Sequence, residues 1–369
     1  MTRQRLRTAA GDAARRLLSV LLYTVLLGLA VVLLLTAALA APLAVLPWVR
    51  LRPLRFAGFL LLFLLADLAG FAAACWVGLR CARLPRERRA ARLEDSSYRL
   101  LAWLLGALIR AAGPLFGLRV RLTPPVPRTV PRSVPGAVPG SRPLLLFARH
   151  AGPGDSLLLV HTLLAEAGLR PQLVLKRFLR WDPCLDILVG RIPHCFVPPG
   201  PRPEVAALIG GLAAAVQPGE VLAVFPEGGN FTAERYRRAI HWLRRTGQLR
   251  RARAAARQRH VLPPRMAGSL AALAGATEAG ADVVFVAHTG LDQLDSPGRM
   301  WAGVPLRAPV RATWWLVPGG QLPEGGAARR EWLDGQWARV DAWISRESGP
   351  VVAGSGAAGD GDQEEVGWA

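Results

Sequence analysis

The hydrophobic residues of this chain follow two patterns, one before and one after residue 143. The first part has two long apolar stretches: 17–49 carries no charge, and 56–79 carries only Asp67. Each exceeds the roughly 20 residues that a helix needs to cross a bilayer. Prolines at positions 42, 47 and 53, near the end of the first stretch and just after it, allow the chain to turn there. The pattern predicts a basic leader at 1–16 followed by a transmembrane hairpin at 17–80.

The distribution of arginine predicts how this hairpin is oriented. Arginines are dense on both outer sides of it, at positions 3, 5, 7, 15 and 16 before it and 80, 83, 86, 88, 89 and 92 after it. The connecting loop holds only Arg50, Arg52 and Arg55. Positive residues stay inside, so a multi-pass protein of the cell membrane is expected, with both ends of the hairpin and the rest of the chain in the cytoplasm. A cleaved signal peptide, with Ala38-Leu39-Ala40 as its site, is the alternative; the length of the apolar run and the second apolar stretch disfavour it.

Two features next to the hairpin stay open at the level of sequence. Asp67 marks either a functional site within the membrane or a tolerated charge. Residues 97–120 predict a helix with leucines on one face, which either lies flat on the membrane or packs under the following domain. Seven prolines then fall within 121–143 and predict an exposed linker, so that 81–143 is a helix-plus-linker segment.

From residue 144 onward, short apolar runs alternate with helical patterns. The runs predict strands at 144–148, 172–175, 220–225, 282–288 and 310–317. The helical patterns fall at 156–166, 203–216, 232–245 and 329–345. This alternation predicts an α/β domain over 144–348. The remaining residues, 349–369, are rich in Gly, Ala, Asp and Glu and predict a disordered tail.

Charge and cysteine content narrow the class of partner. The formal net charge is +20, and Lys176 is the only lysine, so the excess is arginine. Such an excess suits an anionic partner. Ten arginines lie between positions 235 and 259 among few aromatic residues, which favours a membrane surface of phospholipids over nucleic acid. The four cysteines form no C-x-x-C pair and are interpreted as reduced cytoplasmic thiols.

The first chemical motif is Arg149-His150-Ala151-Gly152-Pro153-Gly154-Asp155-Ser156, between a predicted strand and a predicted helix. A histidine can take a proton near neutral pH, and a carboxylate bonded to its other ring nitrogen fixes the tautomer. Two glycines and a proline permit a turn that brings Asp155 back to His150. On this motif alone, Asp155 as a helix cap beside a bystander histidine is an equally acceptable interpretation.

The second motif is Val224-Phe225-Pro226-Glu227-Gly228-Gly229-Asn230-Phe231, which also joins a predicted strand to a predicted helix. Glycines at such a junction let backbone N–H groups approach an anionic ligand. Taken alone, it is also compatible with an ordinary strand-to-helix turn.

Taken together, the two motifs resemble the glycerolipid acyltransferase family, typified by 1-acylglycerol-3-phosphate acyltransferases. Lys176, at the end of Leu173-Val174-Leu175-Lys176, is similar to the family's basic strand end. The segment His260-Val261-Leu262-Pro263-Pro264-Arg265, followed by Gly268, resembles a Leu-x-Pro-Arg-x-x-Gly pattern of the lysocardiolipin-acyltransferase-like branch. The resemblance covers about residues 143–320 and implies an α/β domain with a mixed sheet flanked by helices.

The resemblance also implies a mechanism without an acyl-enzyme. His150 would deprotonate a lysophospholipid hydroxyl, which attacks an acyl thioester of CoA or acyl carrier protein, while Asp155 orients His150. Glu227 and Gly228 would help to bind the acceptor head group. No metal and no cofactor beyond the thioester donor is expected.

The chain departs from the family pattern at the expected head-group site. The family usually continues Phe-Pro-Glu-Gly with Thr-Arg, whereas Gly229 and Asn230 stand here. An acceptor phosphate needs fixed cations, so other residues must replace the missing arginine. The candidates are Lys176 first, Arg265 second and Arg191 third; Arg191 lies in the region of a less clearly matched motif.

Parts of the sequence are also compatible with two other functions. Gly154-Asp155-Ser156-Leu157 spells the signature of GDSL-type esterases, in which the serine is the nucleophile. That class also needs a late Asp-x-x-His, and no histidine here has an aspartate three residues before it. A non-catalytic lipid-binding membrane protein is the other alternative, and the joint presence of His150, Asp155, Glu227 and Gly228 argues against it.

Overall fold

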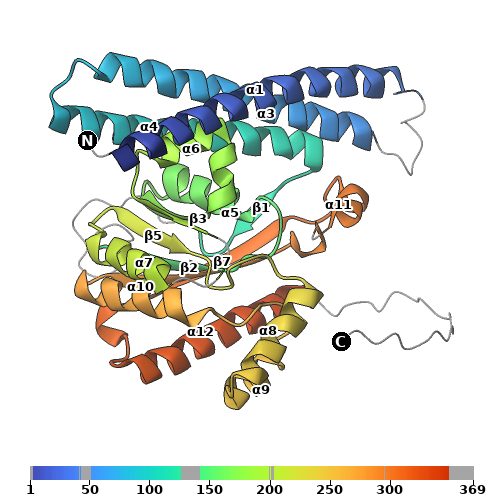
Figure 1. The fold of residues 1–369 in the computed structure, drawn as a ribbon. Helices are drawn as coiled ribbons and strands as arrows, with labels where there is room; N and C mark the ends of the chain where they lie inside the picture. The colour runs from blue at the N-terminus through green and yellow to red at the C-terminus, as the bar shows by residue number, and fades with distance from the viewer. Residues whose placement is uncertain are drawn as a thin grey trace, which may run out of the picture.

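A computed structural model describes residues 3–40, 42, 51–125, 142–198, 200, 203–294 and 296–348. Most of the predicted linker at 121–143, the predicted tail at 349–369 and most of the loop predicted between the first two membrane helices lie outside these ranges. The described chain forms a layer of long helices stacked against an α/β domain (Figure 1).

Three helices in this layer are long and apolar enough to cross a membrane: α1 (Arg3–Leu39), α3 (Arg52–Cys81) and α4 (Arg86–Phe116). The first two correspond to the predicted hairpin and pack against each other. Helix α4 contains most of the helix predicted at 97–120. It buries Leu101, Leu104 and Leu105 against α3 and the domain, so in this structure it packs under the domain.

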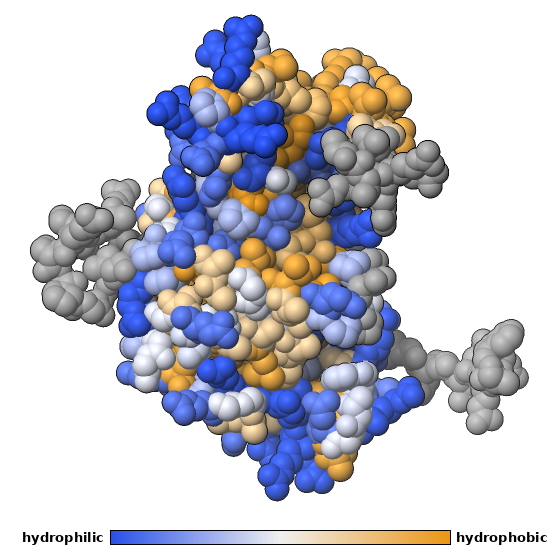
Figure 2. Space-filling model, turned by 60° about the vertical axis from the view of Figure 1, so that its left-hand side comes forward, coloured by the Kyte–Doolittle hydropathy of each residue, from blue (hydrophilic) through white to orange (hydrophobic). Residues whose placement is uncertain are grey.

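The outer face of the helical layer is apolar. Large exposed side chains lie along α1, among them Leu17, Leu21 and Val25, and continue on α3 with Leu62 and Leu65. Hydrophobic surface accordingly gathers at the helical end of the molecule, next to strongly hydrophilic residues (Figure 2). The basic turn between α3 and α4 lies at the same end of the layer as the start of α1 (Figure 1). Both basic segments therefore face one side, as a positive-inside hairpin requires.

The domain is built on a seven-stranded mixed sheet. Its order is β1 (Val120–Leu122), β7 (Val310–Val317), β6 (Asp282–Thr289), β2 (Leu144–Ala148), β5 (Glu220–Val224), β3 (Arg170–Lys176) and β4 (His194–Val197). All neighbours run parallel except β6 and β7. The five predicted strands are thus confirmed, and the short β1 and β4 are additional. Strand β2 is buried along its whole length, as expected for a central strand.

Helices cover both faces of the sheet, which confirms the predicted fold class. On the side of the helical layer lie α5 (Asp155–His161), which continues as a π-helical turn (Thr162–Glu166), and α6 (Pro183–Val189). The other side carries α7 (Pro203–Ala215), α10 (Met266–Glu278) and α12 (Gly326–Glu347) around a core with Trp337 and Phe285. Helices α8 (Ala233–Arg245) and α9 (Leu249–Ala255) project from this side, and α11 (Pro297–Gly303) lies near the far end of α4 (Figure 1).

Polar contacts join the helical layer to the domain along its length. Arg15 and Arg16 of α1 form ion pairs with the buried carboxylate of Asp186 in α6. The guanidinium of Arg52, at the start of α3, donates to the carbonyls of Ala302 and Val304 beside α11. Asp67 of α3 is fully buried, and α3 packs against α6 at this interface. The domain therefore lies beside α3 and α4, not beyond their ends.

Candidate active site

The sheet topology brings both sequence motifs to one edge. His150 follows β2, Lys176 is the last residue of β3, and Phe225 to Gly229 follow β5. These three strands are parallel neighbours, so their carboxyl ends meet at the edge where α/β domains place their ligands.

His150 and Asp155 form a hydrogen-bonded pair at this edge. The turn between them ends at Gly154, whose φ of 84° lies in the left-handed region that glycine adopts without strain. The Nδ1 atom of His150 lies 2.9 Å from both carboxylate oxygens of Asp155. With Nδ1–H donated to the carboxylate, Nε2 carries the lone pair. Within the described part of the chain Nε2 has no hydrogen-bond partner, so it is available as a base.

Asp155 is itself held in place by backbone donors. Its carboxylate accepts N–H groups from Ala151 at 2.7 Å, Gly152 at 3.2 Å and Ser156 at 2.6 Å. Burial of the group raises its pKa, but the hydrogen bond and charge of His150 outweigh this effect and hold the pKa of Asp155 below its usual value. The carboxylate therefore stays ionised and keeps accepting from His150.

Glu227, in the second motif, accepts a hydrogen bond from the backbone of the first motif. The side chain is 3 % exposed; one carboxylate oxygen accepts the N–H of His150 at 3.0 Å and the other that of Leu262 at 2.8 Å. Burial raises the pKa of Glu227 to about 8, while Arg149 and these backbone donors favour the charged form. Both oxygens are already engaged, so in this structure the carboxylate positions backbone. Direct binding of a head group by Glu227 stays a prediction.

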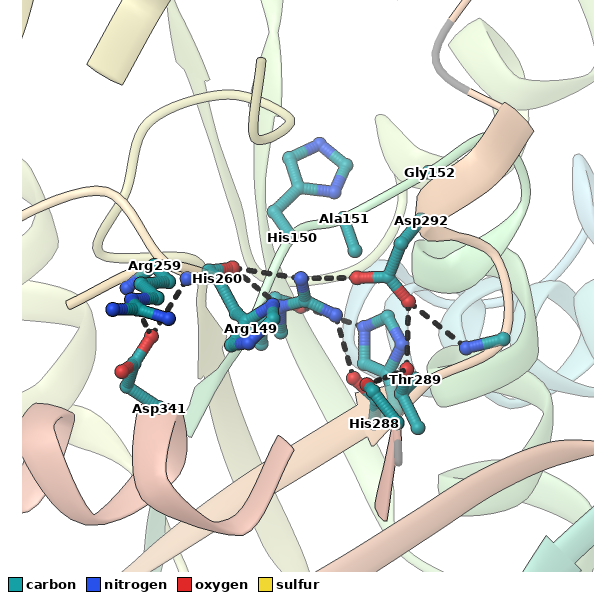
Figure 3. Close-up of polar contacts among 12 residues, drawn as sticks. Arg149, His150, Ala151, Gly152, Arg259, His260, His288, Thr289, Asp292 and Asp341 are labelled. Carbon is teal, nitrogen blue, oxygen red and sulfur yellow. Dashed lines mark hydrogen bonds and ion pairs between the residues drawn. The ribbon is translucent and has the colours of Figure 1, made fainter. Parts of the chain in front are cut away.

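Arg149 is the centre of a buried polar network next to His150 (Figure 3). Its guanidinium donates to the carbonyls of His260 and His288, at distances down to 2.7 Å, and forms an ion pair with Asp292. The ring of His150 points away from this network (Figure 3). Arg149 is 1 % exposed, so its charge is balanced and hydrogen-bonded by these protein groups alone. These contacts hold the loop after β2 against the segment of His260 and the end of β6.

His288, near the end of β6, lies beneath Asp155. Its Nε2 atom is 3.1 Å from the carbonyl oxygen of Arg149 and 3.6 Å from Oδ2 of Asp155. Burial lowers the pKa of His288, so the ring is neutral and Nε2–H is the donor to that carbonyl. Sequence reasoning missed both His288 and Arg149 as parts of the site. The one available signal was Arg149 itself, a charged residue at the end of a fully buried strand.

The three cations predicted for the acceptor phosphate do not all lie together. Lys176 and Arg265 both lie by the Gly228-Gly229 turn that follows Glu227. Arg191 lies elsewhere: it donates to the carbonyl of Ala74 on α3 at 3.0 Å, at the interface with the helical layer. Its guanidinium is occupied there, so Arg191 is not part of this group.

The structure places the hydrogen-bonded pair of His150 and Asp155 at the carboxyl edge of a mixed sheet, the arrangement expected of an α/β enzyme that uses a histidine base. A comparison with protein families identifies it further: residues 127–267 match the family model described as Acyltransferase. This part of the chain is thus a domain of the glycerolipid acyltransferase type, as its motifs predict. No curated protein and no solved structure showed a significant match. Its relation to the lysocardiolipin-acyltransferase-like branch stays a prediction.

Proposed function

We propose that this chain is a membrane-bound O-acyltransferase that transfers a fatty acyl group from acyl-CoA or acyl carrier protein to a lysophospholipid hydroxyl, such as that of 1-acylglycerol-3-phosphate. It would act in phospholipid biosynthesis or remodelling. The observation that carries the proposal is the His150–Asp155 pair, with Nδ1 bonded to the carboxylate and Nε2 unengaged. The family match to residues 127–267 supplies the reaction class.

In the proposed transfer, the His150–Asp155 pair supplies the proton transfers. His150 Nε2 takes the proton of the acceptor hydroxyl as its oxygen attacks the thioester carbonyl. The C–S bond of the resulting tetrahedral intermediate then breaks, and the leaving thiolate takes the proton back from the imidazolium. Asp155 holds the ring orientation and balances the transient positive charge. No group of the protein becomes acylated.

The esterase alternative lacks its catalytic pair in this structure. Ser156 donates its backbone N–H to Asp155, and within the described chain its hydroxyl bonds to no histidine. The nearest motif histidine, His150, uses Nδ1 for Asp155. A nucleophilic serine needs a base within hydrogen-bond reach, so the transferase is favoured.

The membrane part of the proposal is a multi-pass protein of the cell membrane with the domain in the cytoplasm. It is supported by α1 and α3, which are long and apolar enough to form a spanning hairpin, and by the common location of the two basic segments (Figure 1); α4 packs under the domain and is not counted as a third span. The phospholipid surface would then supply the acceptor directly to the domain.

The decisive experiment uses the purified full chain in phospholipid vesicles, radiolabelled acyl-CoA and a panel of lysolipid acceptors. Wild-type protein should form a diacyl product with at least one acceptor. His150→Ala should reduce the rate about 10²–10⁴-fold, because it removes the general base. Ser156→Ala is the matched control and should stay near the wild-type rate. Release of free fatty acid without acyl transfer, abolished by Ser156→Ala alone, would establish the esterase instead. Lipid binding without turnover would establish the non-catalytic alternative.

A further inference from the structure

Three cationic side chains surround the turn that follows the Phe-Pro-Glu-Gly motif. Arg235, in the first turn of α8, donates from Nη1 to the carbonyl of Asn230 at 3.0 Å. That Nη1 atom lies 3.2 Å from the point where a Cβ of Gly229 would stand, and Nζ of Lys176 lies 3.9 Å from the same point. The Arg265 side chain covers Gly228, with Nε 2.5 Å from the position of a Cβ there.

The two glycines make this close approach possible. A Cβ at Gly228 would overlap the Arg265 guanidinium, and the φ of 68° at this residue disfavours any other side chain. A side chain at Gly229 would press on Arg235 and extend into the space beside Lys176. The replacement of the family's Thr-Arg by Gly229-Asn230 therefore removes one arginine and opens the space into which another, Arg235, reaches.

The charges of this cluster are not balanced by acidic partners. Among the described residues, Lys176, Arg235 and Arg265 form no ion pair with a carboxylate. Burial lowers the pKa of Lys176, and the nearby positive charges of Arg235 and Arg265 lower it further. Like charges held this close repel one another unless an anion lies between them. The surface-exposed position of all three leaves the cluster accessible to such an anion.

The cluster is joined directly to the catalytic loop. The rings of Phe225 and His150 lie 4.8 Å apart between centroids, and the N–H of Phe231 donates to the carbonyl of His150 at 2.9 Å. The turn that carries the cations thus contacts His150 at both of its ends. An anionic group bound to the turn would be part of a substrate whose reacting atom is at His150.

We propose that Arg235 completes, together with the expected Lys176 and Arg265, the site that binds the phosphomonoester of the acyl acceptor, and that it supplies the guanidinium that the motif itself lacks. This inference rests on the proposed transferase function and names its acceptor class. A phosphomonoester carries up to two negative charges, and guanidinium groups bind it through paired N–H donors. The phosphates of CoA have the same chemistry, so the experiment must separate acceptor from donor.

The binding test requires no turnover and uses the purified full chain in detergent. Affinity for sn-glycerol 3-phosphate is measured from the rise in unfolding temperature with ligand concentration, at constant ionic strength. Arg235→Gln should weaken binding about tenfold or more, since it removes a hydrogen-bonding charge from the ligand. Arg238→Gln is the matched control: the same helix loses one exposed arginine, which pairs with Glu234. Equal affinities of wild type and Arg235→Gln, or equal losses in both variants, would overturn the proposal.

The kinetic arm distinguishes the two sources of phosphate. Arg235→Gln should raise KM for a lysophospholipid with a terminal phosphate about tenfold and leave KM for acyl-CoA within about twofold. A rise for acyl-CoA that disappears with its 3′-dephospho analogue would assign the cluster to the donor and overturn the acceptor assignment. Arg235-dependent binding of glycerol 3-phosphate in a protein without acyl transfer would retain the anion site and reject the proposed function.

Discussion

Asp155→Asn is the substitution whose effect the geometry defines most closely. The carboxylate accepts from His150 Nδ1 at 2.9 Å and from three backbone N–H groups at 2.6–3.2 Å. An asparagine has one acceptor oxygen and one NH₂ donor in the same volume. If the oxygen faces the backbone donors, the NH₂ faces Nδ1, which must then be unprotonated. Nε2 carries the proton in that tautomer and cannot act as a base.

The expected loss of activity is on the order of 10³–10⁴ in kcat, as for other histidine–carboxylate pairs that adopt the wrong tautomer. The substitution also costs stability, because at least one buried N–H loses its acceptor or meets another donor, at about 1–3 kcal/mol. Because Asp155 does not touch substrate in the proposed mechanism, KM for either substrate should change little.

The assay measures kcat and both KM values in vesicles, together with the free energy of unfolding in denaturant. His150→Ala is the comparison: it should lose similar activity but less stability, since the His150 ring is partly exposed and the backbone bonds to Asp155 remain. Asp155→Asn with a kcat within about tenfold of wild type would refute the role of the pair. A rise in KM that accounts for the whole defect would indicate a binding role instead.

Three further outcomes are expected. Burial lowers the pKa of His288, so below about pH 6.5 this histidine binds a proton in the unfolded chain but not in the folded one. The free energy of unfolding should therefore fall as the pH drops through this value. Denaturant titrations of His288→Gln should show a weaker dependence of that free energy on pH. Glu227→Ala leaves the N–H groups of His150 and Leu262 without acceptors and should lower the free energy of unfolding by about 2–6 kcal/mol; a loss below about 1 kcal/mol would contradict its positioning role. A cysteine in place of exposed Arg237 should resist an impermeant thiol reagent in intact cells and react after lysis; labelling before lysis would reverse the proposed topology.

The main strands were predictable because each is a continuous apolar run in a buried position. Strand β2 is buried at every residue, and the bounds predicted for β7 agree with the structure. Strand β1 has only three residues, of which two are exposed and one is half-buried, and β4 begins with the half-buried His194, so neither produces an apolar run. These edge strands are defined by pairing with β7 and β3, which no local pattern records.

Helices α10 and α6 were not predicted, and the physical reason differs from that for the edge strands. Helix α10 is rich in alanine and glycine and has no polar face, because it packs closely on α7: a Cβ at Gly275 would lie 2.2 Å from the carbonyl oxygen of Gly210. Such contact selects small residues instead of an amphipathic stripe. Helix α6 is short and begins at the pair Asp182-Pro183, a capping signal that sequence reasoning overlooked.

The residues of the candidate site also fall into two groups: those in a local sequence motif and those placed by contacts between distant segments. His150, Asp155, Glu227 and Gly228 were found because each lies in a contiguous motif, where spacing along the chain reflects distance in space. His288 comes from β6 and contacts the site only because β6 pairs with β2. Such residues are fixed by sheet order, which emerges only when all strands are placed. The predicted domain limits stay a prediction, because the boundaries of a domain also depend on contacts between distant segments.

Arg235 shows why a missing motif residue does not define a missing function. The binding of a phosphate depends on the position and charge of the donors around it, whatever their place in the sequence. Arg235, five residues after Asn230, reaches the turn of Gly228 and Gly229 from the first turn of α8. A Cβ at position 229 would lie 3.2 Å from Nη1 of Arg235, so a glycine there favours the position that this arginine takes. On the proposed assignment, the acceptor class of this chain is inferred from the cations around the turn, whatever element supplies them, and not from the two residues that follow Phe-Pro-Glu-Gly.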